Sequence, residues 1–185
     1  MALTPPTEAV AELERAVARA RGRYAQLRWT DSGGWHLTLV FLGEVDADVR
    51  AVLAQRLARV ASRHPAQSLR LAGGGRFGYR VLWAGIDGDK RALSALAAGA
   101  RRAAVKSGIS VDDRPWHGHL TLARVPRLPE PEARAAAFAL RDSVADLSGF
   151  TGTRWTADRL HLVQSITGSG PTRYQDVDSW PLTGR

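Results

Sequence analysis

One four-residue pattern whose side chains could carry chemistry occurs twice in the sequence. His-Leu-Thr-Leu stands at residues 36–39 and again at residues 119–122. A repeat of this kind would arise by chance about one time in a hundred. Side chains alternate between the two faces of a strand, so each copy predicts a leucine face that packs in the core. The opposite face then carries one imidazole and one hydroxyl.

Two imidazoles and two hydroxyls that converge suit the attack of water on a phosphodiester. With an ordinary pKa near ~6.5, one of His36 and His119 can be neutral and act as a base while the other is protonated and acts as an acid. The hydroxyls of Thr38 and Thr121 can donate to non-bridging oxygens, where negative charge builds. Arg124 adds a fixed positive charge and a fork that fits phosphate oxygens. Such a site requires no metal ion or other cofactor.

The two repeat strands must lie across a groove from each other for these side chains to meet. Short turns join several neighbouring strands, which favours mixed or antiparallel sheets over a doubly wound parallel sheet. Packing of the two halves as similar lobes about an approximate twofold axis would bring the polar faces together. Periodicity predicts helices over residues 7–21, 46–63, 89–107 and 131–141. Strands are predicted over residues 26–30, 35–42, 69–72, 79–86, 117–125, 159–167 and 173–180. Turn residues predict that the glycines at 73–75 close the third of these strands and that a turn at 168–171 joins the last two.

The segments around both repeats are similar to those of a known family. Residues 36–45 read HLTLVFLGEV, residues 119–125 read HLTLARV, and LHLVQS at 160–165 is followed by Gly170, Pro171 and Tyr174. In these segments the chain resembles the 2H phosphoesterase superfamily, which is defined by two H-x-T-x motifs. Within it, the chain is similar to the RNA 2′,3′-cyclic phosphodiesterases, also called 2′-5′ RNA ligases. The resemblance covers most of the chain.

The resemblance implies both a fold and a reaction. The fold is α+β, a single domain over residues 1–185 made of two similar lobes, each with one H-x-T-x strand. Its two antiparallel sheets form a V-shaped central groove with helices on the outside. The reaction is metal-independent hydrolysis of RNA 2′,3′-cyclic phosphate ends to 2′-phosphomonoesters, together with reversible 2′-5′ RNA ligation. The implied partner is an RNA or oligonucleotide with such an end.

Roles carry over from the family to individual residues of this sequence. His36 would be the proton donor to the departing 3′ oxygen, and His119 the proton acceptor that activates water. Thr38, Thr121 and Arg124 would hold the phosphate. Phe41 would lie near the nucleotide base, where stacking tolerates any sequence. Strict alternation puts that phenyl ring on the leucine face, so its role needs a twist or bulge in the strand.

Two segments depart from the family pattern. Relatives open with a full apolar strand before a proline-containing turn, whereas only residues 1–3 precede Thr4-Pro5-Pro6 here. The sequence Trp116-His117-Gly118 stands where relatives often carry a proline next to the histidine. His117 shares strand parity with His119 and so could touch the groove. If His117 and His119 were two ligands of a metal ion, the sequence would offer no third ligand at a useful spacing.

Composition narrows the class of protein without identifying it. The 185 residues include no cysteine, which excludes a disulfide scaffold, a thiolate zinc site and a cysteine nucleophile. No apolar run reaches the ~20 residues of a membrane span, and no secretory signal is visible, so we expect a cytoplasmic protein that does not bind membranes. The net charge of +8 suggests a phosphate-bearing partner, although a GC-rich genome would also produce this arginine-rich and alanine-rich composition. Nothing indicates an obligate protein partner, and we expect a monomer.

Two other functions remain open at this point. One is a non-catalytic nucleotide- or RNA-binding module on the same fold, although a pure binder needs no pair of titratable groups. The other is a phosphodiesterase for another cyclic nucleotide phosphate. Of the remaining candidates, His64 is expected to be a surface cap at a helix end. His161 faces the groove or has a core or edge placement. Trp35 and Trp116 either flank the groove or pack in the core.

Overall fold

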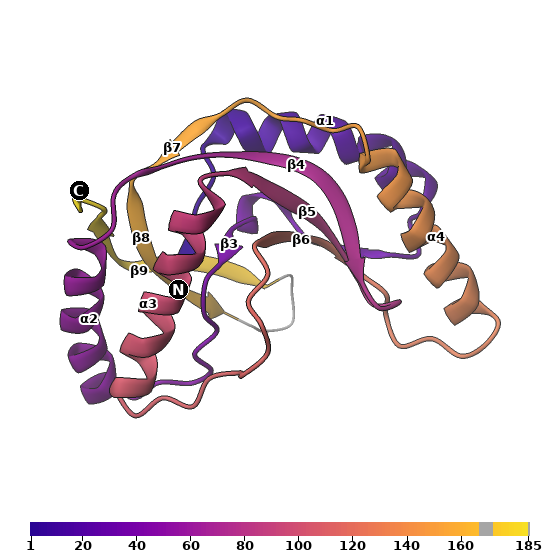
Figure 1. Cartoon of the computed structure of the whole chain (residues 1–185). Coiled ribbons are helices and arrows are strands. Elements are labelled where there is room, and N and C mark those ends of the chain that lie inside the picture. The colour runs from indigo at the N-terminus through magenta and orange to yellow at the C-terminus, as the bar shows by residue number, and fades with distance from the viewer. Residues whose placement is uncertain (167–171, 185) are drawn as a thin grey trace.

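A computed structural model describes residues 1–166 and 172–184 of the chain. The elements form two antiparallel sheets with helices around them (Figure 1). The predicted turn at 168–171 lies outside the described residues. The expected hairpin on either side of it is confirmed, because the two strands pair antiparallel along their lengths.

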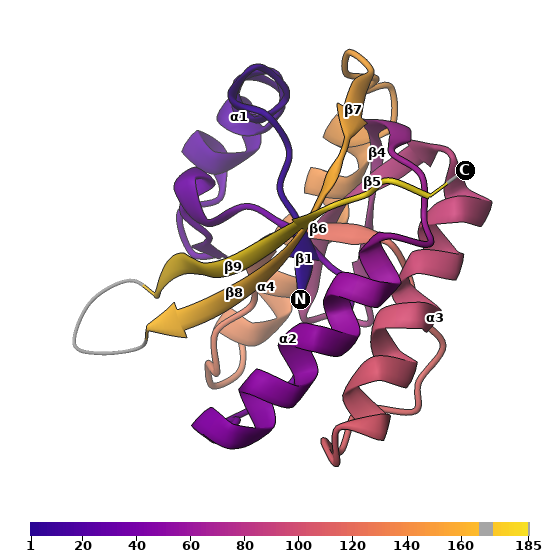
Figure 2. The same cartoon turned by 90° about the vertical axis from the view of Figure 1, so that its left-hand side faces the viewer.

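The helices cover two different parts of the molecule. They are α1 (Thr7–Arg23), α2 (Ala47–Ala61), α3 (Lys90–Lys106) and α4 (Glu132–Leu147). Each buries a row of leucines, valines or alanines spaced by three or four residues, as Leu13 and Val17 do in α1. The prediction ended the last helix at residue 141, but α4 continues for more than a turn and buries Leu147. In Figures 1 and 2, α2 and α3 lie side by side, and Figure 1 shows them away from α1 and α4.

The four-stranded sheet has the order β3-β1-β8-β9. Its strands are β1 (Ala2–Leu3), β3 (Leu37–Thr38), β8 (Arg159–Ile166) and β9 (Arg173–Pro181). The short β1 pairs with both β3 and β8, so it occupies an interior position despite its length. The strand predicted over residues 35–42 is too long, because β3 contains only Leu37 and Thr38. The amides of Leu39 and Val40 both donate to the carbonyl of Met1, at 2.9 and 3.4 Å, which ends the regular ladder after Thr38.

The five-stranded sheet has the order β2-β6-β5-β4-β7. Its strands are β2 (Arg28–Trp29), β6 (His119–Arg124), β5 (Val81–Gly88), β4 (Gln67–Phe77) and β7 (Trp155–Ala157). The edge strand β7 falls in a stretch for which the sequence predicted no element. Helices α1 and α4 pack against each other and against β4.

The glycine triplet does not close a strand, contrary to the prediction, because β4 runs through it to Phe77. The register against β5 shifts between Leu71 and Gly74, which marks a β-bulge, and Gly73 has a φ of 63°. A Cβ on Gly75 would lie 2.2 Å from the Trp83 ring. Glycine is therefore needed here, because the indole of Trp83 lies across the backbone of the neighbouring strand.

The two sheets meet where β3 contacts β6. Residues from both sheets and all four described helices form one hydrophobic cluster. The predicted α+β class, with two antiparallel sheets and outer helices, is confirmed. The division into two similar lobes stays a prediction. None of the described helices is long and apolar enough to cross a membrane.

Candidate active site

The two repeat histidines lie on different sheets that contact each other. His36 immediately precedes β3, and His119 is the first residue of β6. Because β3 and β6 are in contact, the fold brings the two motif strands together. The predicted alternation is confirmed in both copies: the leucines are buried, whereas the histidines and threonines are only partly buried. The leucine faces therefore fix each strand in the core and leave the polar side chains on the other face.

The two imidazoles are held in the same way. Nδ1 of His36 lies 2.8 Å from the carbonyl oxygen of Gly34, and Nδ1 of His119 lies 2.7 Å from the carbonyl oxygen of His117. A carbonyl oxygen can only accept, so Nδ1 carries the hydrogen in both rings. Nε2 is then the nitrogen that gains or loses a proton, and each ring is oriented from two residues upstream.

Burial makes both imidazoles less basic than in water. Desolvation lowers the pKa of His36, and it is opposed by the hydrogen bond to Gly34 and by the charge of Asp176. Desolvation also lowers the pKa of His119; the hydrogen bond to the carbonyl of His117 opposes it, and the charges of His117 and Arg124 act in the same direction as desolvation. The neutral forms are thus favoured in the free protein, and an anion placed nearby would favour protonation.

Aromatic side chains surround His119. Phe77 meets the imidazole edge-to-face with 4.7 Å between ring centroids, and Trp83 lies 6.3 Å away. His117 is stacked near His119 at 6.1 Å and also contacts Trp83 at 4.8 Å. The two rings thus lie near each other, and contact of His117 with the groove stays a prediction. Sequence reasoning missed Phe77 and Trp83, because they lie on β4 and β5 and carry no motif.

His36 lies at a cavity of about 560 Å³ together with Thr38 and Phe41. Tyr174 of β9 also lines this cavity and meets the His36 imidazole edge-to-face at 4.8 Å. The β6 residues His119, Thr121 and Arg124 are not among the side chains that line it. The structure therefore groups three predicted residues at one cavity and places the other three on the adjoining strand.

Phe41 is exposed over 76% of its surface, so it does not lie on the leucine face that strict alternation predicted. The reason is the early end of β3, after which the side chains no longer alternate. Arg124 is exposed at the end of β6, beside Arg28 of β2.

Trp35 connects the two motif strands through a threonine. Its indole N–H donates to Oγ1 of Thr30 at 2.8 Å, and this hydroxyl lies 2.9 Å from the carbonyl oxygen of Thr121. Trp35 is only 3% exposed, so core packing, one of the two predicted alternatives, is confirmed for it. Trp116 is half-buried and also hydrogen-bonds to the opposite sheet.

The remaining two histidines, His64 and His161, have hydrogen-bond partners of their own. Nδ1 of His64 donates to the carbonyl of Val60 at 2.8 Å, which confirms a capping position at the end of α2. Nδ1 of His161 lies 2.8 Å from a carboxylate oxygen of Asp176. Within the described residues, no group of three or more His, Asp or Glu side chains could hold a metal ion.

Comparison with known proteins finds one family to which the chain is similar over most of its length. A model of the 2′-5′ RNA ligase superfamily matches residues 5–168. The RNA 2′,3′-cyclic phosphodiesterase of Geobacillus stearothermophilus is 30% identical over 181 residues, which are 94% of this chain and 54% of that protein. The chain therefore spans about half the length of that relative. The RNA 2′,3′-cyclic phosphodiesterase of Escherichia coli is 32% identical over 153 residues, or 80% of this chain and 76% of that protein.

Solved structures show the same architecture. A crystal structure of a phosphoesterase has a TM-score of 0.79 and 29% identity, and the match covers 98% of this chain and 95% of that chain. E. coli LigT complexed with 3′-AMP has a TM-score of 0.76 and 28% identity over the same shares of the two chains. The fold is LigT-like, and the paired H-x-T-x strands occupy its two sheets. On its fold and on a family match that covers most of its length, the chain belongs to the 2′-5′ RNA ligase superfamily.

Proposed function

We propose that this chain hydrolyses the 2′,3′-cyclic phosphate at the end of an RNA strand to a 2′-phosphomonoester. The observation that carries the proposal is the matched orientation of His36 and His119, in which each Nδ1–H is held by a carbonyl two residues upstream. Each ring then offers a single nitrogen, Nε2, for proton transfer. The names of the relatives from G. stearothermophilus and E. coli support the choice of substrate.

In the proposed reaction, water attacks phosphorus and the bond from phosphorus to O3′ breaks. Nε2 of neutral His119 takes the proton from water, and protonated His36 gives its proton from Nε2 to the departing O3′. One water is consumed, and the products are a 2′-phosphate and a 3′-hydroxyl. The two imidazoles exchange protonation states, which proton exchange with solvent resets. With the 5′-hydroxyl of a second strand in place of water, the same step yields a 2′-5′ linkage.

The other predicted residues act on the phosphate and the base. Thr38 and Thr121 donate hydroxyl hydrogens to the non-bridging oxygens, and Arg124 supplies positive charge beside them. The anionic phosphate offsets the desolvation that lowers the pKa of His36, so the acid can be protonated when substrate is bound. Phe41, exposed at the cavity, stacks on the terminal base in a way that tolerates any sequence.

The test is hydrolysis of a short RNA that ends in a 2′,3′-cyclic phosphate, run in excess EDTA. We expect a 2′-phosphate product from the wild-type protein. His36→Ala and His119→Ala should each lower kcat by roughly 10²–10⁴-fold and leave binding nearly intact. Arg124→Ala should weaken binding as well. His64→Gln is the matched control, because it removes an imidazole that caps α2, and it should turn over normally.

Equal turnover in the wild type and in both repeat-histidine variants would contradict the mechanism. Binding of the cyclic end without any product would instead favour the non-catalytic module. If the protein hydrolyses other cyclic nucleotide phosphates in preference to RNA ends, the proposed substrate is wrong. The proposed roles of His36 and His119 would still hold.

A further inference from the structure

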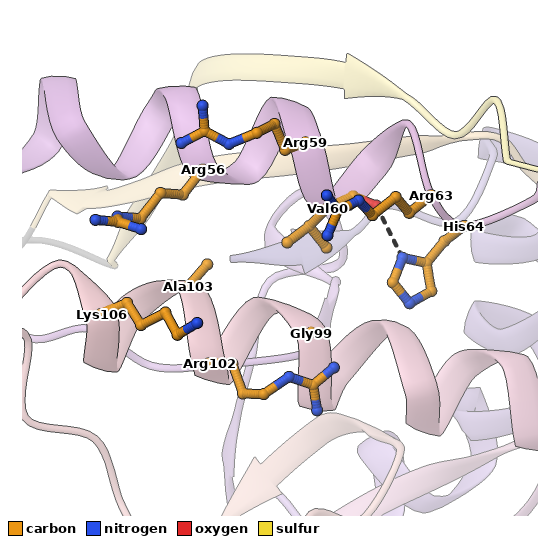
Figure 3. A pocket seen from close by; sticks show the side chains of 9 residues that line it. All are labelled: Arg56, Arg59, Val60, Arg63, His64, Gly99, Arg102, Ala103 and Lys106. Atoms are coloured by element: carbon orange, nitrogen blue, oxygen red, sulfur yellow. Dashed lines mark hydrogen bonds between the residues drawn. The ribbon is translucent and has the colours of Figure 1, made fainter.

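A second cavity, of about 270 Å³, lies between α2 and α3 (Figure 3). It is called here the α2–α3 groove. Its charged lining consists of Arg56, Arg59 and Arg63 from α2 and the turn after it, and Arg102 and Lys106 from α3, with His64 at one end. Figure 3 shows that the cationic side chains come from both helices that flank the groove. No aspartate or glutamate is among the residues that line it.

The groove is separate from the candidate active site. The active-site cavity touches α2 at Arg50 and Leu53, whereas the groove touches it at Arg56, Arg59 and Val60. At 3.6 residues per turn, Arg50 and Arg56 lie about 120° apart around the helix. The buried Leu53 and Leu57 lie between these two flanks. The two cavities therefore share no lining residue and lie on different flanks of the same helix.

Within the part of the chain that the structure describes, no ion pair compensates the charge of the groove. Arg102 and Lys106 of α3 are four residues apart, and like charges at this spacing destabilise a helix. Elsewhere, Arg70 and Arg101 form ion pairs with aspartates. Among the described residues, none of the five groove cations is in an ion pair.

Two further features favour an anionic occupant. Nε of Arg56 is buried and has no hydrogen-bond partner among the described residues, so one donor in the groove is unsatisfied. Gly99 leaves the floor of the groove open, because a Cβ there would lie 3.1 Å from the His64 ring. The helix dipole favours a cation in the last turn of a helix, which accounts for Arg59 in α2 and Lys106 in α3. It does not account for Arg56 or Arg102, which lie before the last turn.

We propose that the α2–α3 groove binds the phosphate backbone of single-stranded RNA, apart from the strand end that enters the active site. From Arg56 to its end at Ala61, α2 advances about 7.5 Å, and Arg63 follows in the turn after it, so this row of cations is longer than a single phosphate group. A strand therefore fits this row of cations better than a single phosphate group does. The choice of RNA rests on the proposed function. The contacts reach only phosphates, so they carry no sequence preference.

The test compares two double variants by fluorescence anisotropy. Arg59→Gln with Arg102→Gln removes two exposed cations from the groove, and Arg15→Gln with Arg19→Gln removes two exposed cations from α1. The probe is a single-stranded RNA of about 20 nucleotides with hydroxyl ends, titrated at several salt concentrations. The groove variant should bind about tenfold more weakly at low salt, with the slope of log K against log[salt] smaller by about 1.4. The α1 variant should bind like the wild type.

The proposal would be overturned if the groove variant had the same slope of log K against log[salt] as the wild type. It would also be overturned if the α1 variant lost as much RNA affinity as the groove variant, because the attraction would then be diffuse. Weaker binding of phosphatidylserine vesicles with unchanged RNA binding would also overturn it. Hydrolysis of a dinucleotide 2′,3′-cyclic phosphate separates the two proposals, and the groove variant should hydrolyse it normally. If the wild type hydrolyses no cyclic phosphate but the groove variant still loses RNA affinity, the proposed function fails and the groove assignment stands.

Discussion

The indole N–H of Trp116 donates a hydrogen bond of 3.1 Å to the carbonyl oxygen of Thr38. Trp116 comes shortly before the second repeat, and Thr38 belongs to the first. In the other direction, Trp35 is connected through the hydroxyl of Thr30 to the carbonyl of Thr121. Each repeat is thus preceded by a tryptophan that is hydrogen-bonded, directly or through one side chain, to the strand of the other repeat. These bonds fix the two sheets relative to each other at the candidate site.

Replacing Trp116 with Phe should disturb the candidate site more than it disturbs the fold. The phenyl ring keeps most of the packing but loses the donor to Thr38, which costs about 1 kcal/mol of unfolding free energy. A small displacement of the motif strand should lower kcat/KM by about tenfold or more. Chemical denaturation and steady-state hydrolysis of a cyclic-phosphate RNA measure the two effects.

Trp155→Phe is the matched control for this substitution. The indole nitrogen of Trp155 is buried and has no hydrogen-bond partner among the described residues, and Trp155 lies on the edge strand β7. Its replacement should leave kcat/KM unchanged. A Trp116→Phe protein with wild-type activity would show that the bond to Thr38 does not position the site.

Gly75→Ala, a substitution in β4, should displace the aromatic side chains that pack around His119. The added Cβ would lie 2.2 Å from the Trp83 ring, which must then move. Trp83 packs against Phe77 and His117, so its movement reaches the aromatic side chains around His119. We expect a loss of about 1–3 kcal/mol in unfolding free energy and a lower kcat.

Gly22→Ala serves as the control for that loss. Gly22 lies in α1 with open space around its Cα, and alanine is favoured over glycine in a helix by up to ~1 kcal/mol. It should be neutral or stabilising and leave kcat unchanged. If Gly75→Ala has normal kcat, the contacts of Trp83 are not needed for catalysis.

The pH dependence follows from the direction of the two pKa shifts. Burial lowers the pKa of both His36 and His119 below the ordinary value near ~6.5. The state with one proton on the pair is therefore most populated on the acid side of that value. We expect a bell-shaped profile of kcat/KM with its maximum below pH ~6.5, and its two limbs belong to the coupled pair. A maximum above pH 7 for a dinucleotide substrate would contradict this prediction.

The sequence predicted the features that depend on local pattern. The alternation of His119, Leu120, Thr121 and Leu122 is strong enough to define a strand and its two faces. The features it did not predict depend on partners distant in the chain. The glycine triplet lies within a strand in which Leu147 packs against Gly74 and the ring of Trp83 against Gly75, and the triplet itself does not reveal these partners.

The same limit applies to Phe41 and to the surroundings of the histidines. The exposure of Phe41 depends on where the ladder of β3 stops, and that is decided by amides that bond to Met1. The Gly34 carbonyl and the rings of Phe77 and Trp83 carry no motif of their own. Only their positions in the fold show that they hold or surround the repeat histidines.

Tyr174 should control the solvation of His36. Its ring meets the imidazole edge-to-face at 4.8 Å, and it also covers Gly34, where a Cβ would lie 2.6 Å from the ring. Tyr174→Ala removes this cover and admits water to the imidazole. Because desolvation is the main cause that lowers the pKa of His36, that pKa should rise toward its ordinary value. Tyr174→Phe keeps the ring and should leave the pKa where it is.

A proton NMR titration of the His36 imidazole measures this shift directly, and the pH–rate profile reports its consequence. In Tyr174→Ala the profile of kcat/KM should move to higher pH, because His36 stays protonated over more of the range. The pKa of His119 should not change, since its ring is covered by Phe77 and Trp83 instead. Equal shifts at both histidines would mean that the substitution opens the whole site, and no shift at either would mean that other groups exclude water from His36.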